Sequence, residues 1–132
     1  MRVPHSIIEA MVEHAREDDP NECCGLIGGR PDEAVTVYRA TNAEASPFRY
    51  SLAPLEQLEL MNQIEEAGEE LVGIYHSHTR TGAWPSQTDI NLAVGWPDAV
   101  WFIVSLENPE NPDVKAFTIH GSEVGVVDIQ VQ

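Results

Sequence analysis

The spacing of apolar residues predicts a chain in which three helices interrupt a series of strands. In three segments apolar side chains recur every three or four residues, the spacing of a helix with one buried face. Alternating or continuous apolar runs, typical of half-buried and fully buried strands, fill most of the remaining sequence. The predicted helices are residues 6–18, 54–68 and 86–94, and the predicted strands are residues 22–27, 34–40, 48–52, 71–78, 100–106, 114–120 and 124–131.

Local signals predict where the first two helices begin. Ser6 with Glu9 three residues later forms a capping-box pattern, and Pro54 suits the first position of a helix. The side chains expected to face the core are Ile8, Met11, Val12 and Ala15 in the first helix, and Leu55, Leu58, Met61 and Ile64 in the second.

The order of these elements predicts an α/β protein in which helices cover a sheet. A chain of 132 residues is long enough to bury a core without disulfides, so residues 1–132 are expected to form one domain. Every apolar run is shorter than the roughly 18 residues that a membrane span needs. The first residues also lack the apolar block of a signal peptide, and a cytoplasmic protein is therefore expected.

Charge and cysteine content narrow the range of partners and compartments. The chain carries 22 acidic and 7 basic residues, a formal net charge of −15, and Lys115 is its only lysine. Because phosphate backbones bind to clustered basic side chains, no nucleic-acid partner is expected. Such a surface favours basic partners, and adaptation to salt is another way to reach it. Cys23 and Cys24 are adjacent and would face opposite sides of a strand, which fits a reducing compartment.

The most informative segment runs from the strand at 71–78 into the helix at residue 86. Successive strand side chains point to opposite faces, so His76 and His78 share one face about 6.7 Å apart. Ser86 and Asp89 are three positions apart and share a face of the helix. Two histidines and one carboxylate, with the fourth place left open, are typical of a catalytic zinc ion.

Each half of this segment also has a structural interpretation. A His-x-His pair alone is a weak indication of a metal, and Ser86 with Asp89 fits a capping box. The combination on a strand, a loop and a helix favours the metal site. The other three histidines, His5, His14 and His120, show no partner pattern and are expected on the surface or on a helix face.

A metal-dependent hydrolase also needs a general base outside the metal shell. Glu22 is the candidate, because it opens a predicted core strand where a single acidic residue stands out among apolar neighbours. The alternative is that Glu22 is the solvated first residue of that strand.

The spacing of these residues resembles a known family signature. His76-x-His78, followed after seven residues by Ser86 and after two more by Asp89, resembles the signature of the JAMM (MPN+) metalloproteases. The segment 22–26 is similar to the one that carries the catalytic glutamate of that family. The resemblance covers about residues 5–106.

This resemblance implies a fold, a cofactor and a role for each residue. The implied fold is a curved mixed sheet flanked by three helices, similar to that of cytidine deaminases. His76, His78 and Asp89 would bind one Zn²⁺ ion per chain. Glu22 would hold and deprotonate the catalytic water, and Ser86 would hydrogen-bond the oxyanion. The implied reaction is hydrolysis of a peptide or isopeptide bond.

Within the family, the nearest resemblance is to small bacterial enzymes that act on ubiquitin-like sulfur-carrier proteins, such as those that free cysteine from the carrier CysO. The matching segments are 41–50, 75–79 and 84–89, with Trp84 where tyrosine is expected. The implied partner is a carrier of the ThiS, MoaD or CysO type, bound through its C-terminal Gly-Gly tail. Such a tail is expected to pair with a sheet edge. Trp84 would either wall a narrow channel for it or pack under the loop.

Two further readings of the fold compete with this one. Members of the fold without metal residues serve as non-catalytic scaffolds or binding modules. This alternative predicts that one or more metal-ligand residues are replaced, whereas here all of them are present. A cytidine deaminase would need an H-x-E motif with a P-C-x-x-C pair, and the chain has neither.

Overall fold

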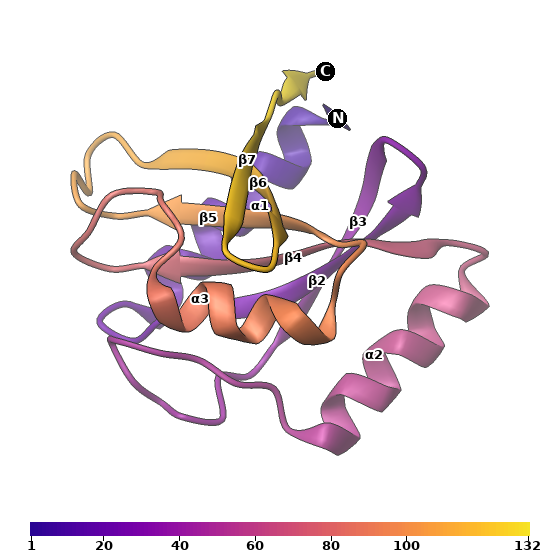
Figure 1. Ribbon diagram of the computed structural model, residues 1–132, viewed down its shortest axis with the longest axis horizontal. Helices are drawn as coiled ribbons and strands as arrows, with labels where there is room; N and C mark the ends of the chain where they lie inside the picture. Colours follow the sequence, from indigo (N-terminus) through magenta and orange to yellow (C-terminus); the bar gives the residue numbers. More distant parts are fainter.

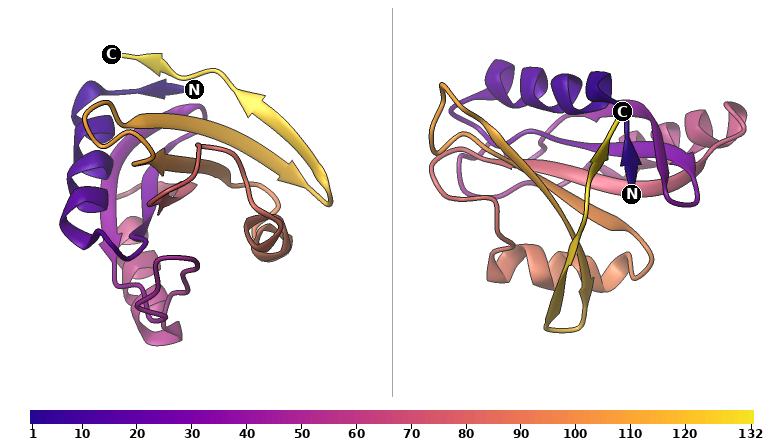
Figure 2. Two further views of the ribbon diagram at one scale, coloured as in Figure 1. Left: turned by 90° about the vertical axis from the view of Figure 1, so that its left-hand side faces the viewer. Right: turned by 90° about the horizontal axis from the view of Figure 1, so that it is seen from above.

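One mixed sheet of eight strands runs through the computed structural model, which describes residues 1–132 (Figure 1). The strand order is β7-β6-β5-β4-β2-β3-β1-β8, and the sheet curls strongly (Figure 2). The central strand β4 pairs antiparallel with β2 and parallel with β5. The strands are β1 (Arg2–Val3), β2 (Cys24–Arg30), β3 (Glu33–Ala40), β4 (Glu70–His78), β5 (Val100–Ser105), β6 (Asp113–His120), β7 (Glu123–Val127) and β8 (Gln130–Val131).

Helices cover both faces of the sheet, as the α/β prediction required. Helix α1 (His5–Asp18) lies on one face, and α3 (Gln87–Leu92), extended by the 3-10 turn η1 (Ala93–Gly95), lies on the other (Figure 2). Helix α2 (Pro54–Glu66) packs Leu60 and Ile64 onto the α3 side. None of the helices combines the length and apolar character needed to span a membrane.

The two faces of the central strands enter two separate cores. Cys24 belongs to the core under α2 and α3, whereas Cys23 belongs to the core under α1, so the two thiols do face opposite ways. The prediction that residues 100–106 form a strand buried on both faces is also confirmed, since Trp101 to Ser105 are all buried.

Several predicted details of the helices are wrong. Ser6 does not cap α1; the helix begins at His5, with Pro4 as its N-cap residue and no side-chain cap hydrogen bond. Ile8 and Val12 are only half-buried, because the face that α1 turns to the sheet is Ile7, Met11, His14 and Ala15.

In α2 the predicted buried face is rotated from the observed one. Leu55 and Leu58 are 77% and 57% exposed. Leu60 takes the buried position instead, and Met61 packs at the edge of the core. Pro54 does occupy the first turn of the helix, as predicted.

Two predicted strands also differ from the structure. Residues 48–52 form a loop, in which the Asn42 side chain takes up backbone groups that a strand would pair. The strand predicted at 124–131 is interrupted at residues 128–129. Its two parts, β7 and β8, pair with β6 and β1 near opposite ends of the strand order.

Candidate active site

Strand β4 places both predicted histidines on one face of the sheet. His76 is opposite Cys24 of β2 and Ile103 of β5, so its backbone is held between two paired strands. His78 is the last residue of β4, next to the loop that leads to α3. Both side chains are buried on the α3 face, and the ring of Tyr50 stacks on His76 with centroids 4.5 Å apart.

Helix α3 brings the carboxylate to the histidines. Ser86 Oγ accepts the Asp89 backbone N–H at 3.2 Å, and Asp89 Oδ2 accepts the Ser86 N–H at 2.9 Å, so the predicted capping box forms. The same carboxylate lies 3.1 Å from His76 Nε2 through Oδ1 and 3.0 Å from His78 Nε2 through Oδ2. The capping and metal-site interpretations of this pair are therefore compatible, because they use different contacts.

The surroundings of these three side chains set their charge. Burial alone would raise the pKa of Asp89, but the charge of His76 and hydrogen bonds from both histidines and from Ser86 hold it far below its usual range. Burial would lower the pKa of His78, yet hydrogen bonds to Asp89 and Gly82, with nearby negative charges, raise it. The Asp89 carboxylate and the His78 imidazole thus favour each other's charged forms.

The three side chains fit a zinc ion. The Nε2 atoms of His76 and His78 are 3.2 Å apart, and the Asp89 oxygens are equally close to them. Ligands placed about 2.0–2.1 Å from a tetrahedral zinc ion stand about 3.3 Å from one another. His78 Nδ1 donates to the Gly82 carbonyl at 2.9 Å, which leaves its Nε2 lone pair for a metal. The group can hold a metal ion.

Glu22 lies just before β2 and not within it, because the strand starts at Cys24. It is nevertheless buried, with 6% of its surface exposed, so it is not the solvated strand residue of the alternative interpretation. Burial raises its pKa from 4.5 to about 7; the charge of His78 opposes this shift, and the charge of Asp89 adds to it. A carboxyl group with such a pKa can accept and return a proton near neutral pH.

One cavity joins the remaining predicted residues. Glu22, His78 and Ser86 line a hollow of about 210 Å³, together with residues 47–48 and 79–81. The structure therefore brings all five predicted side chains to one place. Trp84 does not line this cavity; it is 55% exposed and packs edge-on against Phe117, with ring centroids 5.2 Å apart.

Sequence reasoning missed the residues that hold this site in place. Asn42 donates to the carbonyls of Glu22 and Arg49 at 3.0 Å and accepts from the backbone of Ser51 at 3.3 Å, so it ties the Tyr50 loop to Glu22. Ser77 Oγ accepts the Cys23 N–H at 2.8 Å, which fixes the residue after Glu22 against β4. A loop residue such as Asn42 follows no periodic pattern, so the sequence does not indicate this role.

His14, expected on the surface or on a helix face, lies on the face of α1 that turns to the sheet. It is buried rather than exposed; its Nε2 lies 3.3 Å from Asp18, and its Nδ1 lies 2.6 Å from the Tyr75 hydroxyl. Because Nε2–H points to a carboxylate, Nδ1 accepts from Tyr75. This buried chain links α1 to the face of β4 opposite the histidines.

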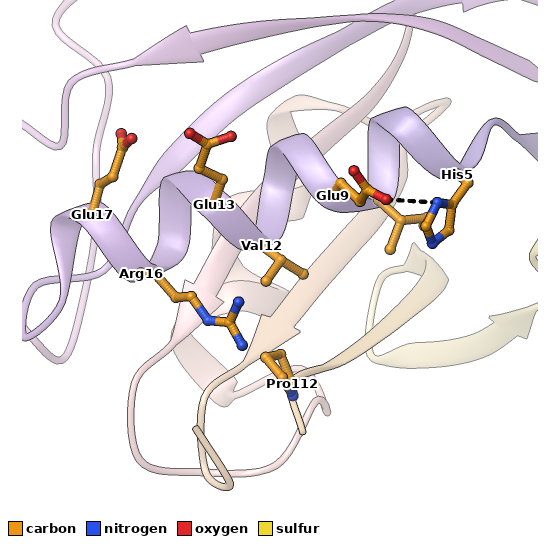
Figure 3. Close-up of a pocket in the computed structure, with 8 residues that line it drawn as sticks. His5, Glu9, Val12, Glu13, Arg16, Glu17 and Pro112 are labelled. Atoms are coloured by element: carbon orange, nitrogen blue, oxygen red, sulfur yellow. Dashed lines mark ion pairs between the residues drawn. The ribbon is translucent and has the colours of Figure 1, made fainter. Parts of the chain in front are cut away.

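The largest hollow in the surface lies away from the candidate active site. It measures about 650 Å³ and follows α1, on the opposite side of the sheet (Figure 3). His5 and Glu9, paired at 2.7 Å, stand at one end, and Arg16 and Glu17 stand towards the other. None of the predicted site residues lines it.

The fold and the relatives of the chain define a peptidase of the JAMM class. The chain belongs to the family described as prokaryotic homologs of the JAB domain, which matches residues 4–120. It is 42% identical over 118 residues, 86% of this chain and 78% of the relative, to the CysO-cysteine peptidase of Mycobacterium tuberculosis. It is 36% identical over 104 residues, 74% of each chain, to the desampylase of Haloferax volcanii.

A solved structure confirms the architecture. The solution structure of a protein from Desulfitobacterium hafniense matches with a TM-score of 0.90 and 36% identity, over 100% of this chain and 93% of that one. The curled mixed sheet with three helices is thus the family fold.

Proposed function

We propose that residues 1–132 form one zinc-dependent peptidase domain that hydrolyses the bond after the C-terminal Gly-Gly tail of a ubiquitin-like sulfur carrier. The observation that carries this proposal is the closed group of His76, His78 and Asp89 with Glu22 beside it. The names of the relatives, a CysO-cysteine peptidase and a desampylase, support the substrate class.

The side chains have separate roles in this proposal. Zinc held by the two histidines and Asp89 would lower the pKa of a water molecule and polarise the scissile carbonyl. Glu22, with a pKa of about 7, takes a proton from water and returns it to the leaving nitrogen. Ser86 Oγ accepts from Asp89 N, so its own O–H remains free to donate to the oxyanion.

Exposed apolar side chains on α2 and in the loop before it support a protein substrate. Leu55 and Leu58 of α2 are exposed, and Phe48 in the loop before this helix is 79% exposed. Exposed apolar side chains grouped on neighbouring segments are typical of protein-binding surfaces. The folded body of a carrier would contact them while its tail enters the cleft.

The first test is zinc content combined with turnover. Purified protein should bind one zinc ion per chain, and His76→Ala and Asp89→Ala should lose it. Glu22→Gln should keep the zinc but lower kcat about 10²- to 10⁴-fold on a carrier with cysteine after its Gly-Gly tail.

His120→Ala, a change at an exposed histidine outside the site, is the matched control and should alter neither zinc content nor turnover. Failure of the wild-type protein to bind zinc after reconstitution, or full activity of Glu22→Gln, would refute the proposal.

A further inference from the structure

The cavity beside Glu22 contains a cation that the chemistry described so far does not use. Arg80 lines it together with Glu22, His78 and Ser86. Its guanidinium makes no ion pair and no hydrogen bond, whereas Arg2, Arg30 and Arg39 are each paired with a glutamate.

Arg80 is one of two arginines whose side chain makes no ion pair or hydrogen bond, and the other, Arg49, does not line the cavity. Of the 7 basic side chains, four pair with a carboxylate: Arg2, Arg30, Arg39 and Lys115. Arg80, which lines the same cavity as the candidate general base Glu22, remains available for a ligand. Guanidinium groups bind carboxylates through two parallel hydrogen bonds, which makes arginine the usual receptor for that group.

The size and polarity of the cavity limit what can enter. Its volume of about 210 Å³ is below the roughly 300–1,000 Å³ of pockets for drug-sized ligands. A second cavity, of about 180 Å³, adjoins the site on the side of Tyr50, but Trp96 and Trp101 help to line it and it contains no cation. A third cavity, of about 350 Å³, is lined by the acidic residues Glu17, Asp18 and Glu22. Of the cavities next to the site, only the Arg80 cavity therefore offers a cation to a small anionic group.

From this we infer that the Arg80 cavity receives the residue released by hydrolysis and that Arg80 binds its free α-carboxylate. The inference rests on the proposed function and makes it more specific: the substrate is a linear tail ending Gly-Gly-Xaa, with one residue after the scissile bond. A lysine side chain in an isopeptide bond has no carboxylate at that distance and continues into a second protein.

The chemistry balances without a further reactant. Water gives its hydroxyl to the glycine carbonyl carbon, and the C–N bond breaks as the nitrogen takes a proton. The products are a carrier that ends in a glycine carboxylate and a free amino acid with an ammonium and a carboxylate group. Arg80 is thus a specificity-determining residue for the leaving group.

The test compares two substrates that differ only at the carboxylate. A carrier ending Gly-Gly-Cys and the same carrier ending Gly-Gly-Cys-amide are assayed with wild type, Arg80→Gln and Arg80→Lys, with zinc content as the check on folding. Wild type should favour the free acid about 10- to 100-fold in kcat/KM, which is the effect expected of one charge-assisted hydrogen bond. Most of this difference should appear as a lower KM for the free acid. Arg80→Gln should lower kcat/KM for the free acid to about its value for the amide, and Arg80→Lys should keep most of the preference.

Arg49→Gln is the control of equal charge, because Arg49 also has an unpaired guanidinium but does not line the cavity. It should leave the preference unchanged. If wild type cleaves acid and amide equally, or prefers a lysine isopeptide, the role of Arg80 is refuted and the peptidase function stands. If it cleaves no Gly-Gly-tailed carrier at all, the proposed function fails and the role of Arg80 fails with it.

Discussion

At the scale of single residues, burial gives ordinary side chains unusual acid–base properties. Glu22, Asp89 and His14 are all buried, but their neighbours differ. Glu22 has no hydrogen-bonding cation and its pKa rises, whereas Asp89 lies between two histidines and its pKa falls. Glu22 and Asp89 could be identified from the sequence, whereas a role for His14 could not. The charge states of Glu22 and Asp89 depend on neighbours that only the fold brings to them.

His14 leads to a prediction about pH. Burial lowers its pKa below the ordinary 6.5, although Asp18 opposes the shift. The unfolded chain therefore binds a proton at His14 more readily than the folded one. The contribution of His14 to stability is complete above pH 6.5 and is lost as pH falls below it.

Urea unfolding of wild type and His14→Gln at pH 7.5 and pH 5 measures this effect. Glutamine can still accept from Tyr75 but does not titrate, so the drop in unfolding free energy on acidification should be smaller in the variant. An equal drop in both proteins would contradict a buried, neutral His14.

At the scale of elements, β4 and its neighbours were the most predictable part of the chain. The strand and its histidines could be predicted because their signal lies in consecutive residues. The buried face of α2 could not, since Leu55 and Leu58 form as good an apolar stripe as Leu60 and Ile64. Only packing against the sheet decides which stripe is covered, and the first stripe remains exposed.

The close contact between β2 and β4 leaves no space for a side chain at Gly25. A Cβ added at Gly25 would overlap the ring of Tyr75, which is fully buried. Gly25→Ala should therefore lower the unfolding free energy by about 1–3 kcal/mol, the cost of overpacking a core. Gly95→Ala, where nothing lies within 4 Å of the added carbon, is the matched control. Thermal or urea unfolding of the two variants should separate them clearly, and equal stability would contradict this packing.

At the scale of the whole molecule, the contacts that hold α1 and the candidate active site lie on opposite faces of the sheet. Helix α1 and the His14–Tyr75 link lie on one face, and the metal-binding group, α2 and α3 lie on the other. The sequence predicted a sheet with helices, but not that β7 and β8 lie near opposite ends of its strand order. That arrangement depends on pairing between strands that are far apart in the sequence, and local sequence patterns do not reveal such pairing.

The exposed face of α2 predicts how the substrate body binds. Leu55→Asp combined with Leu58→Asp should raise KM for a folded carrier about tenfold or more, because each leucine contributes roughly 1.5–3 kcal/mol when buried. Turnover of a short Gly-Gly-tailed peptide should not change. Val126→Asp, at a 70% exposed position on β7, controls for added charge. Equal KM changes with carrier and peptide would show that α2 does not contact the carrier body.

Strand β4 contributes side chains to both faces of the sheet, and this limits where residues can be inserted or deleted. Tyr75 and Ser77 point to the α1 side, while His76 and His78 point to the other. Losing or gaining one codon within 71–78 would exchange the two sets and send the histidines towards α1. Insertions and deletions between related proteins should therefore fall in the flanking loops, and the length of this strand should stay fixed even where its apolar residues vary.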